Sequence, residues 1–150
     1  MNVSLDLSGQ RVLVTGATGF LGRHVVNGLH EAGASVMVVY RDAEKLQGPN
    51  LIDDGGIVPW DLDLPVTEAS RRSIKGCHIA VHLAGKVASS SPEDDSDLML
   101  GNLVPILHLL QALPENCRHV VFMSSYAVYG QIQEADENSP TEPTDMYGVA

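Results

Sequence analysis

The sequence is poor in cysteine and in basic residues and has no long apolar run, and each of these features excludes certain classes of protein. Its two cysteines, Cys77 and Cys117, form no CxxC pair, so we expect reduced thiols and a cytoplasmic protein rather than a disulfide framework. Nine Lys and Arg against 19 Asp and Glu leave a net charge of −10, which disfavours nucleic acid and anionic membranes as partners. No apolar run approaches the roughly 20 residues of a membrane span. The N-terminal MNVSLDLSGQR lacks the basic start and apolar stretch of a signal peptide.

Short apolar runs alternate along the chain with stretches of helical spacing. A chain of 150 residues is long enough for one domain, and we expect residues 1–150 to form one. Pro59 places the third apolar run at a sheet edge, and Gly101 with Pro105 weakens the first half of the second helix. The pattern predicts strands over Arg11–Thr15, Ser35–Tyr40, Ile57–Trp60, Ile79–Leu83 and His119–Ser124, and helices over Phe20–Ala32 and Asp97–Leu113.

This alternation predicts an α/β fold with a doubly wound parallel sheet, a Rossmann arrangement with strand order 3-2-1-4-5. Continuous apolar strands of this kind are typical of a sheet covered on both faces. Residues 130–145 are acidic and contain Pro140 and Pro143, so we expect a surface loop near the carboxyl ends of the strands, where ligands bind. The residues up to Ala150 resemble the first turn of a further helix.

The strongest local signal is the segment Thr15–Gly22, TGATGFLG, which follows a predicted strand and opens a predicted helix. Gly16 allows a tight turn, Gly19 allows a pyrophosphate to approach the backbone, and Gly22 allows the helix to pack closely on the sheet. The free N–H groups of the helix start would then face the anion. The segment therefore predicts a dinucleotide-binding site.

The end of the second strand should meet the adenosine ribose, and the sequence there is Tyr40–Arg41–Asp42. An acid at the strand tip would bind the ribose hydroxyls of NAD, whereas Arg41 suits the 2′-phosphate of NADP. Arg41 therefore favours NADP over NAD. Two alternatives stay open: an exposed Arg41–Asp42 pair at a turn, and an Asp42 that turns inward and selects NAD.

Six motifs occur in an order that resembles a known family. They are TGATGFLG, the WDL of Trp60–Leu62, HLAG from His82, Asn102, SSYAVYG from Ser124, and MYGVA from Met146. This order is similar to that of the extended short-chain dehydrogenases/reductases, the NAD(P)-dependent epimerases and dehydratases that often act on nucleotide sugars. The resemblance spans essentially the whole chain and covers the N-terminal part of such enzymes, before the last strands and the substrate lobe.

The resemblance implies a set of cofactor-binding residues. Asp61 would accept a hydrogen bond from the adenine amine, although it is also a plausible turn residue. Asn102 corresponds to the family asparagine, although it could instead cap a helix that restarts after Gly101. The implied cofactor-binding residues are Gly16, Thr18, Gly19, Phe20, Leu21, Gly22, Arg41, Asp61, Leu62, Leu83, Ala84, Gly85 and Asn102.

The resemblance also implies the catalytic residues. Tyr147 would exchange a proton with a substrate hydroxyl while a hydride passes to or from the nicotinamide. Ser125 would hydrogen-bond the same oxygen, with Ser124 as the close alternative. In the family's Y-x-x-x-K motif the lysine that lowers the tyrosine pKa would follow Ala150, so we expect the 150-residue chain alone to be inactive.

The resemblance implies an oxidoreductase or isomerase of the epimerase/dehydratase type that acts on a nucleotide sugar. The alternatives are an NADPH-dependent ketone reductase of the same family and a non-catalytic dinucleotide-binding module. His78 and His82 share a strand face without a third ligand, so no metal site is expected. An apolar stripe indicates either core or the surface of a homodimer, and its residues are Leu100, Leu103, Val104, Leu107, Leu110 and Leu113.

Overall fold

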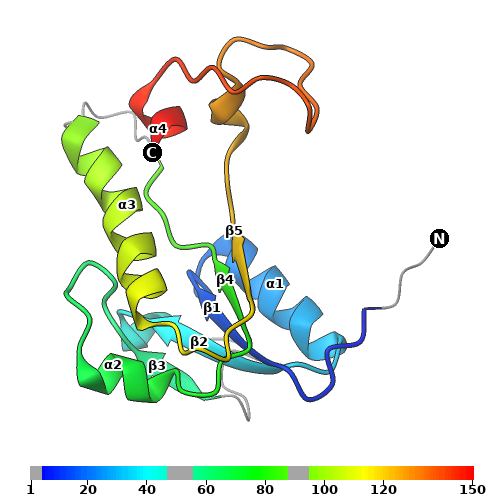
Figure 1. The fold of residues 1–150 in the computed structure, drawn as a ribbon, viewed down its shortest axis with the longest axis vertical. Helices are drawn as coiled ribbons and strands as arrows, with labels where there is room; N and C mark the ends of the chain where they lie inside the picture. The colour runs from blue at the N-terminus through cyan, green and yellow to red at the C-terminus, as the bar shows by residue number, and fades with distance from the viewer. Residues whose placement is uncertain (1–4, 47–55, 88–94) are drawn as a thin grey trace.

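The computed structural model describes residues 5–46, 56–87 and 95–150 and contains one five-stranded parallel sheet (Figure 1). The strand order is β3-β2-β1-β4-β5, as the sequence predicted, and all four neighbouring pairs are parallel. The strands are β1 (Arg11–Thr15), β2 (Ser35–Tyr40), β3 (Ile57–Pro59), β4 (Ile79–His82) and β5 (His119–Phe122). The helices are α1 (Phe20–Glu31), α2 (Glu68–Ser73), α3 (Asp95–Ala112) and α4 (Met146–Val149), with 3-10 turns η1 (Ala43–Lys45) and η2 (Tyr126–Tyr129).

Side chains of alternating direction on the strands build a core on each face of the sheet. On β1, Leu13 faces a cluster that includes Leu109 and Ala112 of α3, whereas Val12 and Val14 face a cluster with Val26 of α1. Period-two alternation of side chains in a strand explains this division. In Figure 1, α1 accordingly covers one face of the sheet and α3 covers the other.

The helix α3 is longer and more regular than the sequence suggested. Pro105 is buried inside it, and the helix passes through Gly101 and Pro105 without a break, so the expected weakening of its first half was wrong. Leu109 and Ala112 are buried against the sheet. The free energy of this packing exceeds the cost of the one backbone hydrogen bond that proline cannot donate. Because Asn102 lies well inside α3, its alternative interpretation as an N-cap was also wrong.

Two further features were missed or misjudged. The short helix α2 has no apolar periodicity; a reciprocal capping box between Thr67 and Ser70 begins it. The sheet was expected to be covered on both faces, yet all four residues of β5 are exposed, Val121 and Phe122 by about half. Among the described elements only β4 pairs with β5, so it forms an edge of the sheet.

The loop over residues 130–145 contains no helix or strand and lies beyond the carboxyl end of β5 (Figure 1), as predicted. The hydroxyl of Tyr126 bonds the carbonyl oxygens of Ile132 and Gln133 at 2.8 and 3.0 Å, which anchors the start of the loop on η2. None of the helices in the described part of the chain is long and apolar enough to cross a membrane.

Candidate functional site

The glycine turn between β1 and α1 is packed so closely that side chains are excluded from it. Gly16 has a φ of +69°, and a Cβ there would lie 2.7 Å from the backbone nitrogen of Ala84. A Cβ on Gly22 would lie 2.1 Å from the carbonyl oxygen of Gly16. Both contacts are with backbone, which cannot move aside as a side chain would. The turn therefore requires glycine at both positions.

The first turn of α1 is open to an anion. Gly19 is its N-cap, no side chain accepts from the helix N–H groups, and no acidic residue occupies the first turn. The first N–H groups of a helix have no partner within the helix and carry the positive end of its dipole. This donor set fits a phosphate, so the residues present fit the diphosphate of a dinucleotide.

A cavity of about 340 Å³ lies beside this turn, at the carboxyl ends of β2, β3 and β4. Its volume is in the range of pockets that bind small molecules. Many of the residues predicted to bind the cofactor line it: Gly16, Thr18, Gly19, Arg41, Asp61, Leu62, Leu83, Ala84 and Gly85. The topology brings these separate segments together because the carboxyl ends of parallel strands meet at one edge.

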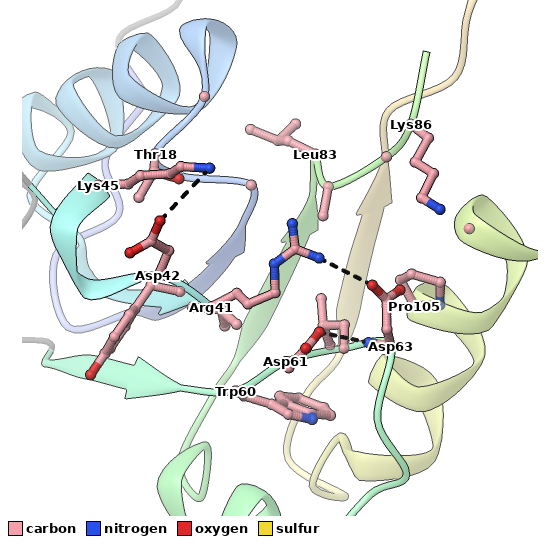
Figure 2. A pocket seen from close by; sticks show the side chains of 18 residues that line it. Thr18, Arg41, Asp42, Lys45, Trp60, Asp61, Asp63, Leu83, Lys86 and Pro105 are labelled. Atoms are coloured by element: carbon pink, nitrogen blue, oxygen red, sulfur yellow. Dashed lines mark hydrogen bonds and ion pairs between the residues drawn. The ribbon is translucent and has the colours of Figure 1, made fainter. Parts of the chain in front are cut away.

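Charged side chains cluster at the mouth of this cavity, where β2 ends (Figure 2). The guanidinium of Arg41 reaches across to Asp63, with 3.1 Å between Nη1 and Oδ2. Asp42 caps the turn η1 by accepting from the N–H of Glu44, and its other oxygen is 3.9 Å from the ammonium of Lys45. Both ion pairs are largely exposed, so each contributes little to stability. A charged ligand could replace either pairing at little cost.

The loop that follows β3 is held by a hydrogen bond from α3 and by a turn of its own. Asp61 accepts from the backbone N–H of Asp63 at 3.1 Å, so it does form the turn that was the alternative interpretation. The Nδ1 of His108 is 2.7 Å from the carbonyl oxygen of Leu62. A carbonyl only accepts, so His108 donates, and its Nδ1 carries the proton. His108 thus fixes the backbone of the segment expected to contact adenine.

Buried hydrogen bonds of the Thr15 hydroxyl join β1 to β4 and to the segment after it. The hydroxyl of Thr15 accepts from the N–H of Ala84 at 3.3 Å and is 2.8 Å from Nδ1 of His82. His82 is only 1% exposed and stacks on Phe122. Burial lowers the pKa of His82 from 6.5 to about 4, so the ring is neutral at physiological pH. His82 is therefore a neutral, packed side chain at the end of β4.

A second cavity of about 250 Å³ contains the predicted catalytic side chains. Ser124, Ser125 and Tyr147 line it, together with Leu21 and Asn102. Leu83–Lys86 line both cavities and so connect them. The result is one continuous surface at the carboxyl ends of the strands, with the glycine turn at its centre and three hydroxyl groups toward one end.

Local geometry explains how Tyr147 comes to lie near the two serines. The Oγ of Ser125 caps η2 by accepting from the N–H of Ala127 at 3.2 Å. A Cβ on Gly148 would lie 2.5 Å from the carbonyl oxygen of Ala127, so glycine allows α4 to approach η2 closely. Asp145 caps α4 through the N–H of Gly148 at 2.7 Å.

Asn102 acts on the backbone after β4. Its Oδ1 accepts from the N–H of Lys86 at 2.8 Å, and its Nδ2 donates to the carbonyl oxygens of Lys86 and Leu98 at 3.1 and 3.0 Å. A Cβ on Gly85 would lie 2.9 Å from Oδ1 of Asn102, so a side chain there would displace the amide from its hydrogen bonds. Asn102 therefore positions the segment that lines both cavities.

Two of the predicted cofactor-binding residues line neither cavity. The side chain of Phe20 is 80% exposed, and Gly22 is buried under the turn. The sequence predicted no role for Asp63 or His108, because nothing in their local sequence shows that the fold brings them to this site. Trp60 was part of the WDL motif without a role of its own, and it lines the first cavity. Within the described ranges, no group of three His, Cys, Asp or Glu side chains could hold a metal ion.

The sheet order and the glycine turn at its carboxyl edge define an α/β domain of the Rossmann type. Residues 12–150 match the sequence model of the NAD dependent epimerase/dehydratase family, and the chain belongs to that family.

Similar proteins agree with this assignment. The chain is 33% identical to UDP-glucose 4-epimerase 2 of Arabidopsis thaliana over 91% of its own length and 43% of that protein. It is 29% identical to dihydroflavonol 4-reductase of Zea mays over 76% of its own length and 34% of that protein. The structure of UDP-glucose 4-epimerase from Thermus thermophilus in complex with NAD superimposes with a TM-score of 0.75 at 29% identity, covering 93% of this chain and 47% of that one. The chain therefore spans less than half the length of these relatives.

Proposed function

We propose that this chain is the dinucleotide-binding part of an epimerase/dehydratase-type enzyme that acts on a nucleotide sugar. The observation that carries the proposal is the meeting of the glycine turn and three hydroxyl side chains on one continuous edge of the sheet. The nucleotide-sugar substrate is supported by the names of the relatives, several of which are UDP-glucose 4-epimerases.

The cofactor-binding residues divide between the two cavities. The N–H groups at the start of α1 would hold the diphosphate, and Asp61 and Leu62 would contact the adenine. Leu83–Gly85 would lie under the dinucleotide where the cavities meet. When bound, the nicotinamide supplies the site that accepts or donates a hydride.

Tyr147 would exchange the proton of the substrate hydroxyl at its phenol oxygen. Ser125, or Ser124, would hydrogen-bond the same substrate oxygen as charge develops on it. Tyr147→Phe is therefore expected to lower kcat by about 10²–10⁴-fold and to leave the Kd of the cofactor unchanged. The assay requires a protein in which this chain is joined to a substrate lobe like that of its relatives; equal losses in cofactor affinity and kcat would instead assign Tyr147 to cofactor binding.

Turnover separates the two enzymatic alternatives. An epimerase returns its cofactor to the starting state, so UDP-glucose would be converted without net consumption of NADPH or NADH. A ketone reductase would instead consume NADPH stoichiometrically with its product, and the similarity to dihydroflavonol 4-reductase makes this the second candidate. Binding of dinucleotide without turnover of either kind would favour the non-catalytic module.

For the cofactor we propose NADP in preference to NAD. Arg41 stands at the end of β2, and Asp42 is engaged in capping its own turn. Arg41→Asp is expected to weaken NADP binding about 10–100-fold more than NAD binding, because it removes a charge-assisted contact with the 2′-phosphate. Calorimetric titration with both cofactors measures this difference. Arg118→Asp, the same charge change just before β5, serves as the control, and an equal loss for both cofactors would contradict the proposal.

We also propose a homodimer that forms through α3. Leu100, Leu107 and Leu110 of this helix are about half exposed, and with Leu103 they follow a 3-4-3 spacing on one side of the helix. Leu107→Glu is expected to convert dimer to monomer in light scattering. Leu64→Glu, at a comparably exposed leucine outside α3, is expected to leave the dimer intact.

A further inference from the structure

The two cysteines lie together at the amino-terminal edge of the sheet, opposite the cofactor site. Their Sγ atoms are 3.9 Å apart, and both thiols are free. Cys77 lies two residues before Ile79 of β4, and Cys117 lies two residues before His119 of β5. Because Ile79 and His119 are register partners, the two cysteines occupy equivalent positions just before two neighbouring strands.

The ladder between β4 and β5 continues to the cysteines. The N–H of Arg118 donates to the carbonyl oxygen of His78 at 2.9 Å, and the side-chain amide of Asn116 donates to the carbonyl oxygen of Cys77 at 3.0 Å. Neighbouring strands are about 4.8 Å apart, within the roughly 4.4–6.8 Å between Cα atoms that a disulfide accepts. The sulfur atoms need to approach by about 2 Å to reach bonding distance, a movement that side-chain rotation can supply.

We propose that Cys77 and Cys117 are a reversible oxidation site that closes to an intramolecular disulfide by reaction with a low-molecular-weight disulfide such as oxidised glutathione. This inference concerns the edge of the sheet opposite the cofactor site, so it does not depend on the proposed function.

The two thiols have different roles because their surroundings differ. Cys117 is half-buried, whereas Cys77 is completely buried and donates to the carbonyl oxygen of Ile79 at 3.1 Å. Burial, reinforced by the neighbouring Cys117, raises the pKa of the Cys77 thiol to about 12. A protonated, enclosed thiol is a poor first nucleophile, so Cys117 meets the oxidant and Cys77 completes the reaction.

The reaction balances in two exchanges. The Cys117 thiolate attacks one sulfur of oxidised glutathione, the glutathione S–S bond breaks, and one glutathione leaves as a thiolate that takes up a proton. The sulfur of Cys77 then attacks Sγ of Cys117, the mixed disulfide breaks, and the second glutathione leaves with the proton of Cys77. The protein loses two protons and two electrons, and one glutathione disulfide becomes two thiols.

The test exposes the reduced chain to oxidised glutathione under native conditions and follows intact mass, free thiols and oligomeric state. The expected product is a chain lighter by the mass of two hydrogens, without free thiols, without intermolecular crosslinks, and restored by dithiothreitol. Peptide mapping should locate the bond between Cys77 and Cys117. A wild-type chain that retains both thiols, that stops at a stable glutathione adduct, or that crosslinks only between molecules would overturn the proposal.

Single variants separate the two roles. Cys77→Ala is expected to accumulate a stable glutathione adduct on Cys117, because no second thiol resolves it. Cys117→Ala is expected to leave Cys77 unmodified over the same period. Rapid modification of Cys77 in the folded Cys117→Ala variant would contradict the assigned order of attack; the wild-type result tests the disulfide itself whether or not either variant folds.

Discussion

Single glycines have unequal roles in α1, and the structure separates them. Gly22 lies under the glycine turn, where a Cβ would meet the Gly16 carbonyl oxygen and the Ala17 backbone, whereas a Cβ on Gly28 would meet nothing within 4 Å. Both lie in the same helix, so one substitution tests close packing and the other tests helix propensity alone.

Gly22→Ala is expected to destabilise the chain by at least ~2 kcal/mol, because the added methyl group overlaps backbone atoms. Gly28→Ala is expected to stabilise it by about 0.5–1 kcal/mol, since alanine is the better helix former. Thermal unfolding of both variants measures the difference. Equal effects of the two substitutions would show that the turn is looser than described.

The neutral, buried ring of His82 makes stability depend on pH. The unfolded chain binds a proton on this histidine below a pH of about 6.5, and the folded chain does so only below a pH of about 4. Stability is therefore complete above pH 6.5 and falls as the pH falls toward 4, by about 3 kcal/mol from this one group.

His82→Asn removes the titrating ring and retains a polar atom toward Thr15. Denaturant unfolding from pH 7 to 4 is expected to show a shallower loss of stability in this variant than in the wild type. Parallel curves for the two proteins across that interval would assign the acid sensitivity to other groups.

The helix α3 lines the first cavity through Gly101 and Pro105, and its His108 reaches the segment after β3. Its donor holds the Leu62 carbonyl oxygen, and this contact joins α3 to the segment after β3. His108→Leu is expected to weaken binding of ADP-ribose about 5–10-fold through loss of one hydrogen bond, whereas nicotinamide mononucleotide binding stays unchanged.

His108→Asn provides the matched control, because its amide can place a donor near the position of Nδ1. Recovery of ADP-ribose affinity in this variant would support positioning by the hydrogen bond. Equal losses for Leu and Asn, or a loss for both ligands, would contradict it.

Elements with a strong local pattern could be predicted from sequence. β1, β2 and α1 have apolar periodicity and a glycine turn between them, and their bounds are confirmed within a residue. The helix α2 escaped prediction because a capping box rather than apolar spacing defines it. The continuity of α3 through Pro105 depends on packing against the sheet, which no local pattern records.

In the candidate site, too, the features with a local sequence pattern were predictable and those that depend on long-range contacts were not. The glycine turn and the Leu83–Gly85 segment have local signatures, so the sequence located them at the first cavity. The contribution of His108 and the pairing of Arg41 with Asp63 join segments far apart in the sequence, and only the strand order brings them together. The role of Asn102 in holding Lys86 was likewise visible only in the fold.

At the scale of the whole molecule, the proposed cofactor site and the cysteine pair lie at opposite ends of the strands. The carboxyl edge holds both cavities and the charged residues at the end of β2, while the amino edge holds the cysteine pair. Strand β5 is exposed over its whole length. The proposed function depends above all on the carboxyl edge, where bare backbone donors are expected to bind a dinucleotide diphosphate.

Amide NMR of the isotopically labelled chain, titrated with NADP and NAD, examines these donors one by one. We expect the largest shift changes at the amides of Gly16–Leu21 and Leu83–Gly85, with the amides around Cys77 and Cys117 at the opposite edge unchanged. If neither cofactor shifts these amides, or if the shifts are concentrated around Cys77 and Cys117, the glycine turn does not bind a dinucleotide.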